Sequence, residues 1–199
     1  MQQMSIIQEW KKNFVAPLLK QHGFLMKQGE FIYKTDSVSR IIAVTPYRFN
    51  PENFIIEYGV HRSTIPLFST LETIDRPKLY HCQIKTYVRD KKGHGMLFNA
   101  GKWIPKRQDE LKSILLNVVA QTEDWSDPRK FISMILNDDP LIPYGPLYKK
   151  VLLIYLYLEC GEREKALSVA STTNVNGLEE HEAAVWSKAL QALAAGMSS

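Results

Sequence analysis

Hydrophobic residues recur at helical spacing near the start of the chain. Neighbouring members of this stripe lie three or four positions apart, which predicts a helix with one buried face. The stripe consists of Ile7, Trp10, Phe14 and Leu18. Ser5 precedes it and Gln8 follows three positions after Ser5, which is the pattern of a capping box. Pro17 is expected to kink or restart the helix, because its ring clashes with the carbonyl group of the preceding turn.

Beyond residue 30 the pattern changes to the period of two that is typical of strands. The segments that show it are residues 31–34, 40–47, 54–61 and 80–89. Polar residues alternate with apolar ones in the last two segments, which predicts an antiparallel sheet of four to five strands with one face toward solvent. The stretch between residues 62 and 79 is predicted to hold a short helix at 67–74.

From residue 105 onward the helical period returns. The predicted helices cover residues 109–121, 126–136, 148–160, 162–171 and 178–195. A break at 137–146 contains three prolines and one glycine. A sheet covered by a single helix would expose apolar surface, so we expect the first two of these helices to pack on it. The sequence therefore predicts an α+β domain over residues 1–140, followed by a helical hairpin and a third helix over residues 141–199.

Residues 14–61 resemble the bacterial family of domains of unknown function numbered 4304. The helix ends in Leu-Lys-x-x-Gly-Phe, a Phe-Ile-Tyr strand follows, and a later strand reads Phe-x-Ile-x-x-Gly-Val. The resemblance implies an α+β fold with Phe24 and Phe31 in the core, and with Gly23 and Gly59 where the backbone needs a small residue. It implies no activity.

Residues 152–170 are similar to one helical hairpin of the tetratricopeptide type. An aromatic first helix ends at Gly161, and Ala166 allows the second helix to pack closely. A solenoid needs about three such repeats, and one is visible here.

Composition and charge narrow the class of protein. The 199 residues carry a net charge of +4 and are 45% hydrophobic, as in ordinary folded domains. The first hundred residues hold 14 Lys and Arg against 8 Asp and Glu, which makes this half basic. Cys82 and Cys160 are far apart and have no metal-binding spacing, so we expect reduced thiols and a cytoplasmic protein. The longest apolar run is too short to cross a bilayer, so no membrane partner is predicted.

Aromatic residues of the C-terminal helices are the first candidate surface. Four tyrosines there are predicted to contact a partner protein: Tyr144, Tyr148, Tyr155 and Tyr157. Aromatic side chains are enriched where proteins bind one another.

The polar face of the sheet is the second candidate. It is predicted to expose Glu57, His61, His81, Lys85, Tyr87 and Arg89. Arg40, Arg48 and Arg62 would extend its basic character, and a basic surface with interleaved aromatic rings is typical of proteins that bind single-stranded nucleic acid. Two facing histidines beside a carboxylate would instead suit a general base or a metal site. An ordinary solvent-exposed strand accounts for the same residues.

No motif for catalysis, cofactors or metal binding appears in the sequence. It contains no HExxH, P-loop or GxSxG pattern, and Cys82 lies on the apolar side of its predicted strand. The sequence therefore favours a non-enzymatic protein-interaction module of the immunity or regulatory type, without a cofactor, whose partner is another protein. Nucleic-acid binding through the basic half is an alternative, and an enzyme with a site around His61 and His81 is a further one.

Overall fold

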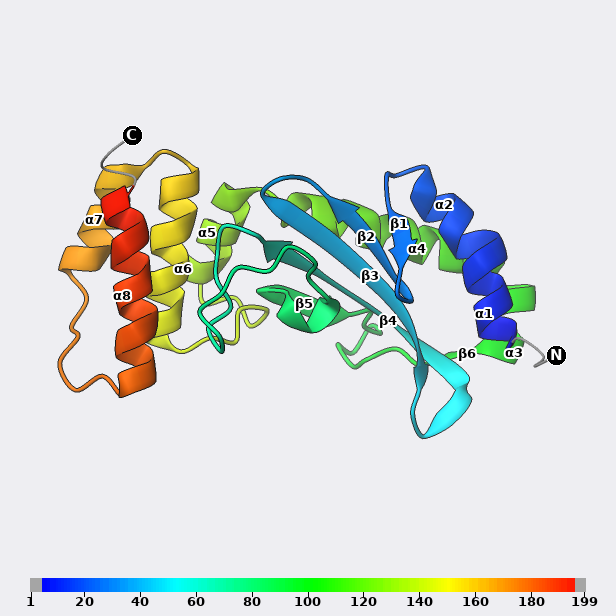
Figure 1. Cartoon of the computed structure of the whole chain (residues 1–199). Coiled ribbons are helices and arrows are strands. Elements are labelled where there is room, and N and C mark those ends of the chain that lie inside the picture. Colours follow the sequence, from blue (N-terminus) through cyan, green and yellow to red (C-terminus); the bar gives the residue numbers. More distant parts are fainter. Residues whose placement is uncertain (1–4, 196–199) are drawn as a thin grey trace. The chain divides into compact units, whose positions relative to one another are not determined.

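The structure, a computed structural model, describes residues 5–195 (Figure 1). They divide into two compact units. The first comprises the chain up to His61 together with Pro77–Asp124. The second comprises Arg62–Arg76 and the chain from Trp125 on. Of the helices within residues 5–195, none has the length and apolar character needed to span a membrane.

The first unit begins with a helix in three consecutive parts, α1 (Ile6–Trp10), the π-helical η1 (Lys11–Val15) and α2 (Ala16–Lys20). The Ser5 hydroxyl accepts a hydrogen bond from the Gln8 amide at 3.3 Å, and both halves of the predicted capping box are present. Pro17 lies in the first turn of α2, where its missing N–H costs least. The widened π turn directly before it agrees with the predicted disturbance at Pro17.

An antiparallel sheet forms the centre of the first unit. Its strands are β1 (Leu25–Lys27), β2 (Glu30–Lys34), β3 (Val38–Tyr47), β4 (Asn50–Arg62), β5 (Ile84–Tyr87) and β6 (Phe98–Asn99). They lie in the order β1-β2-β3-β4-β5, and β6 pairs with β4 beside β5. The predicted α+β class with an N-terminal helix is therefore confirmed. The short strands β1 and β6 carry too few residues to show a period of two, so the sequence pattern did not indicate them.

One face of the sheet is covered by helices. Phe54 of β4 lies with its ring centroid 5.3 Å from that of Trp10 and 5.2 Å from that of Phe98. Helices α3 (Ala100–Lys106) and α4 (Gln108–Asp124) extend the cover, and the Tyr58 hydroxyl donates a 2.7 Å hydrogen bond to Gln121 of α4. The alternating pattern of β4 thus places its aromatic residues in the core, as predicted.

The opposite face carries a loop that crosses the strands. Leu79 and Cys82 pack on Ile41 and Ala43 of β3 around the short 3-10 helix η2 (Leu79–His81). The predicted strand at 80–89 is therefore wrong in its first half, since pairing with β4 begins at Ile84. Leu79 and Cys82 serve this cross-sheet packing instead of an edge pairing with β4.

Four helices form the second unit: α5 (Pro128–Leu136), α6 (Pro146–Glu159), α7 (Arg163–Ser171) and α8 (Glu180–Ala195). Helix α6 is buried along Val151–Tyr157 and packs against the other three. No helix forms at 67–74, where the described chain makes turns only. Of the two helices expected to cover the sheet, α4 packs on β3 and α5 packs on α6. The domain boundary at residue 140 stays a prediction.

Candidate functional site

A polar depression of about 320 Å³ opens on the sheet of the first unit. It is lined by Glu57, Leu79, Tyr80, Lys85, Thr86, Tyr87 and Arg89. The register of β4 and β5 explains this grouping, because Glu57 lies opposite Tyr87 and Gly59 lies opposite Lys85. Residues two apart on a strand share a face, so Lys85 and Tyr87 point the same way.

The depression unites four of the six residues predicted for the polar sheet face. Glu57, Lys85, Tyr87 and Arg89 line it, whereas His61 and His81 do not. Sequence reasoning missed Leu79 and Tyr80 as members, because these residues reach the depression from the crossing loop. The proline at position 77 was the one indication that the strand could not extend that far back.

His61 is buried, which corrects the prediction that it faces solvent. Its Nδ1 lies 3.0 Å from the backbone carbonyl oxygen of His81, because the crossing loop covers this end of β4. His81 accepts a 3.0 Å hydrogen bond from the Lys78 amide on its own Nδ1. Burial, together with the nearby Lys78, lowers the pKa of His81, so this ring is neutral near pH 7. The two histidines therefore meet through the His61 ring and the His81 backbone, and neither lines the depression.

Tyr87 is fixed in place by its neighbours. A β-carbon on Gly95 would lie 2.9 Å from the Tyr87 ring, so only glycine leaves room for the ring there. The guanidinium carbon of Arg89 lies 5.4 Å from the centre of the same ring, within cation–π range. The turn beyond is closed by Asp90, which accepts hydrogen bonds from the amides of Lys92 and His94. The Arg89–Gly95 bridge completes this turn.

The Cys82 thiol is expected to be unreactive in the folded protein. It is buried under the crossing loop, and burial raises its pKa well above the ordinary value. In a Cys160→Ser variant, which leaves one thiol, iodoacetamide should modify Cys82 only after denaturant is added. Mass spectrometry of the native and unfolded protein measures this, and rapid native labelling would contradict the packing described here.

The turn between β3 and β4 forms a second feature, the hairpin tip, which consists of Tyr47, Arg48 and Phe49. Phe49 is 71% exposed. The Arg48 guanidinium carbon lies 4.3 Å from the centre of the Phe49 ring, and the Tyr47 ring meets it edge-on at 5.5 Å. The tip extends past the strands that flank β3 and β4 (Figure 1). No sequence pattern distinguished these residues from an ordinary turn.

The four tyrosines predicted as a partner surface do not form one exposed set. Tyr155 and Tyr157 are buried on α6, so the expectation that they face a partner is corrected. The Tyr155 hydroxyl donates to the Lys188 carbonyl at 3.3 Å, and burial raises its pKa to about 12. Tyr144 and Tyr148 are half-buried against Phe68, with ring centroids 5.4 and 4.9 Å away. Helices α5, α7 and α8 pack against α6, and this packing covers Tyr155 and Tyr157.

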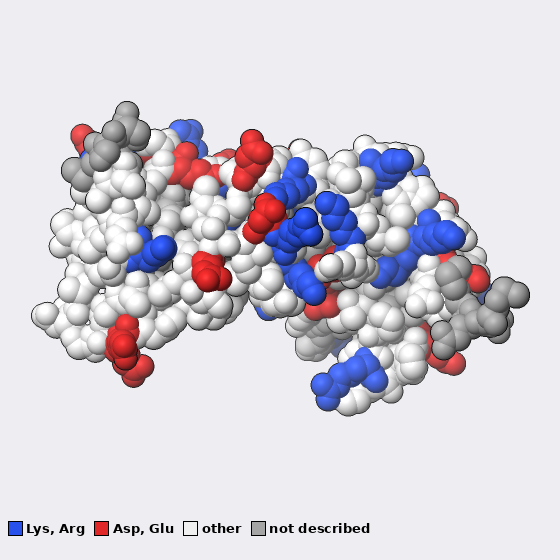
Figure 2. All heavy atoms as spheres, in the orientation of Figure 1, with Lys and Arg blue, Asp and Glu red and all other residues white. Residues whose placement is uncertain are grey.

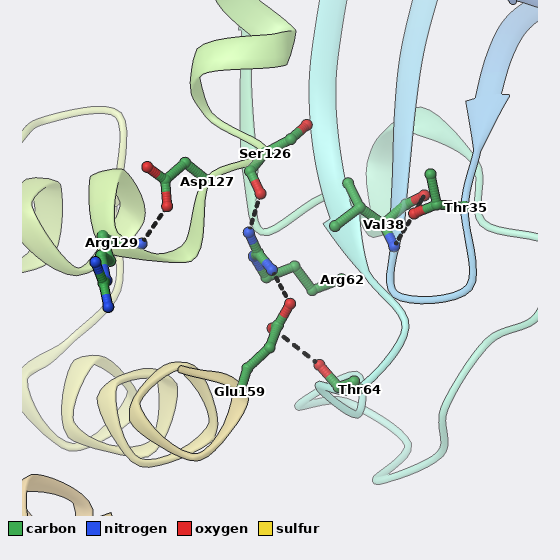
Figure 3. Close-up of polar contacts among 8 residues, drawn as sticks. All are labelled: Thr35, Val38, Arg62, Thr64, Ser126, Asp127, Arg129 and Glu159. Atoms are coloured by element: carbon green, nitrogen blue, oxygen red, sulfur yellow. Dashed lines mark hydrogen bonds and ion pairs between the residues drawn. The ribbon is translucent and has the colours of Figure 1, made fainter. Parts of the chain in front are cut away.

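Two of the three arginines assigned to a basic surface are buried. Arg40 packs its guanidinium over the ring of Tyr33 at 3.8 Å. Arg62 contacts the Glu159 carboxylate and the Ser126 carbonyl oxygen within the second unit (Figure 3). The Thr64 hydroxyl adds a hydrogen bond to Glu159 at 3.5 Å. These arginines therefore stabilise structure, and the polar sheet face keeps Lys85 and Arg89 as its cations.

Within residues 5–195, no group of three or more His, Cys, Asp and Glu side chains is arranged to hold a metal ion.

A family model described as a domain of unknown function, DUF4304, matches residues 15–129. The chain belongs to the DUF4304 family. The DUF4304 match includes β1 to β6, the depression and the hairpin tip, and it ends at the start of α5. No curated protein and no solved structure matches the chain.

The helices beyond the DUF4304 match have their own packing. Helices α6 and α7 form a hairpin whose turn contains Gly161 in the left-handed region, with φ of 71°. Ala166 is fully buried where α7 approaches its neighbours. The similarity to a tetratricopeptide hairpin stays a prediction, which these local features support.

Proposed function

We propose that this DUF4304 protein is a non-enzymatic protein-interaction module of the immunity or regulatory kind, and that its hairpin tip is the anchor of the interface. The exposure of Phe49 carries the proposal. The Phe49 ring is 71% exposed, so most of its apolar surface contacts water. Burial of that surface against a partner releases hydrophobic free energy. Together with Tyr47 and Arg48, Phe49 places residue types that are enriched at interface centres at one end of the hairpin.

The tip is organised before binding. Arg48 and Tyr47 both pack against Phe49, so its ring has fewer orientations to lose when a partner binds. Ordering of side chains is one of the main costs of association, and preformed anchors reduce it. Aromatic residues and arginine are also the types that contribute most at interface centres.

The chemistry of the tip defines the partner. Phe49 needs a hydrophobic pocket, and Arg48 needs carboxylate or carbonyl oxygens at the rim of that pocket. A partner protein with an apolar pocket and an acidic rim meets these requirements.

Replacing Phe49 by alanine is expected to abolish capture of the partner while leaving the protein folded. The loss should exceed tenfold, because a central aromatic anchor contributes about 2 kcal/mol or more. Quantitative capture from a native lysate of the source cells, with the wild-type and variant chains side by side, measures this. Leu97→Ala is the matched control, since Leu97 is also an exposed apolar residue of the first unit.

The test compares the proteins captured by three chains: the wild type, Phe49→Ala and Leu97→Ala. A protein bound by the wild type and by Leu97→Ala, and lost with Phe49→Ala, supports the proposal. Recovery of the same proteins in the same amounts by all three chains would contradict it.

A further inference from the structure

We propose that the polar depression of the first unit binds single-stranded nucleic acid, with a base stacked on Tyr80 or Tyr87 and a phosphate held by Lys85 and Arg89. The site is separate from the hairpin tip, so the inference does not depend on the proposed protein partner. Its support comes from charge, exposed rings and size, each taken from residues that the structure places together.

The charge of the first unit suits a polyanion. By its bounds this unit holds 16 Lys and Arg against 10 Asp and Glu, a net charge of +6, whereas the second unit has 9 against 11, or −2. Lys and Arg side chains gather over the strands on the face that Figure 2 shows. A local excess of cations of this kind attracts phosphate groups and raises their rate of association.

Two exposed rings supply surfaces for bases. Tyr80 is 64% exposed and Tyr87 is 40% exposed, although both line the depression. Each ring is held by a neighbour: Tyr80 meets the His81 ring with centroids 4.1 Å apart, and Tyr87 lies against Gly95. Stacking of a base on a fixed aromatic ring is the usual contact of proteins that bind single strands.

The cations lie where a phosphate would follow a stacked base. Lys85 shares the solvent face of β5 with Tyr87 at a separation of about 6.5 Å along the strand. The guanidinium carbon of Arg89 lies within cation–π range of the Tyr87 ring. Both cations are exposed, in contrast to Arg40 and Arg62.

Glu57 is the one carboxylate among the lining residues. Glu57 lies opposite Tyr87 in the register of β4 and β5, so its carboxylate lies beside the stacking ring. Its negative charge repels phosphate from that position. Its oxygens can accept hydrogen bonds from a base amino group or a ribose hydroxyl. The arrangement therefore orients the strand, with the base toward Glu57 and the phosphate toward Lys85 and Arg89.

The size and openness of the site favour a single strand over a duplex. A volume of about 320 Å³ lies at the lower end of the range for small-ligand sites, which suits a single nucleotide unit, and the depression is open to solvent, so a longer strand can continue beyond it. Stacking on Tyr80 and Tyr87 requires unpaired bases, which a duplex does not offer. Single-stranded oligonucleotides are therefore expected to bind more tightly than the same sequence as a duplex.

Fluorescence anisotropy with the full chain tests the inference. The probes are a labelled single strand of about 12 nucleotides, as RNA and as DNA, and the corresponding duplex. Tyr80→Ala is expected to weaken single-strand binding by about 5- to 150-fold, and Tyr80 is exposed enough that its loss leaves the fold intact. Lys85→Gln should reduce the slope of log affinity against log salt by about 0.7, measured between about 50 and 200 mM.

Two matched control variants distinguish oligonucleotide binding at the depression from general electrostatic attraction to the basic surface. Lys112→Gln removes an exposed cation of α4 and should change affinity by less than Lys85→Gln. Phe49→Ala removes the ring of the hairpin tip and should leave oligonucleotide affinity unchanged. If Phe49→Ala abolishes protein capture and oligonucleotides fail to bind, the proposed function stands and this inference falls.

Three results would overturn the inference. The first is no binding of any oligonucleotide at about 50 mM salt, where electrostatic attraction is strong. The second is equal weakening by Lys112→Gln and Lys85→Gln, with no effect of Tyr80→Ala. The third is competition by poly-glutamate at the same charge concentration as the oligonucleotide, which would assign the depression to an acidic protein segment.

Discussion

Replacing Glu159 by alanine is expected to lower the free energy of unfolding by about 3–5 kcal/mol. Glu159 carries the carboxylate that faces Arg62, and Arg62 is fully buried in the second unit (Figure 3). Without the carboxylate, the Arg62 guanidinium stays out of water, keeps the Ser126 carbonyl oxygen beside it and loses the negative charge of Glu159. A buried charge that loses its partner costs several kcal/mol, far more than an exposed pair contributes.

Urea denaturation followed by circular dichroism measures the effect. Asp138→Asn is the matched control, because it removes the carboxylate of the exposed Lys149–Asp138 pair, at 2.8 Å, from the same unit. Asparagine tolerates the left-handed backbone at this position, where φ is 52°, so that substitution tests charge alone. It is expected to cost less than about 1 kcal/mol. Equal midpoints for Glu159→Ala and Asp138→Asn would show that the buried pair is not what stabilises this region.

A double replacement adds a positive test. Exchanging Arg62 for methionine and Glu159 for leucine removes both charges and keeps apolar volume. This variant is expected to recover most of the stability lost by Glu159→Ala, because no buried charge remains to be desolvated.

Replacing Phe54 by alanine is expected to cost about 3–5 kcal/mol of folding free energy. The Phe54 ring is fully buried between Trp10 and Phe98, so truncation leaves a cavity that a rigid sheet and helix cannot close. The lost stability has two parts. The alanine variant no longer gains free energy from burying the ring, and the atoms around the cavity lose their van der Waals contacts with it. Because Phe54 joins β4, β6 and α1, the whole first unit should become less stable.

The same substitution five residues earlier is the control. Phe49→Ala also removes a phenyl ring, but that ring is mostly exposed, and the cost should stay within about 0.5 kcal/mol. Urea midpoints of the two variants, followed by tryptophan fluorescence, give the comparison. A Phe49→Ala protein as unstable as Phe54→Ala would contradict the packing and would also invalidate the capture experiment.

Local patterns of residues predicted much of this fold. The alternation along β4 put Phe54, Ile56 and Tyr58 in the core, where the structure has them. The pair Ser5 and Gln8 predicted the helix start, because capping needs only residues within one turn. Such features depend on neighbours along the chain, and their physical causes are contained in a few consecutive residues.

The candidate sites were less predictable. Lys85, Tyr87 and Arg89 were expected on an exposed strand face. Their spacing of two residues was sufficient to place them on the same face of a strand. The inclusion of Tyr80 and the exclusion of His61 depend on the loop that crosses β3 and β4. Nothing within a strand indicates which of its faces a distant segment will cover.

Burial of the charged and aromatic residues was decided by tertiary packing. Arg62 lies at the end of an alternating strand and Tyr155 in an apolar helix, and either could have faced water. Arg62 is buried because Glu159 and Ser126, far along the chain, supply its partners. Tyr155 is buried because α8 covers that side of α6, where the Lys188 carbonyl oxygen accepts a hydrogen bond from the Tyr155 hydroxyl.

The sequence by itself determined the family, the α+β class, the start of the first helix at its capping box, and the core face of β4. Only the tertiary structure decided which polar residues line the depression, which arginines are buried and where Phe49 is presented. The physical reason is that backbone periodicity is a local property, whereas exposure depends on segments that meet after the chain has folded.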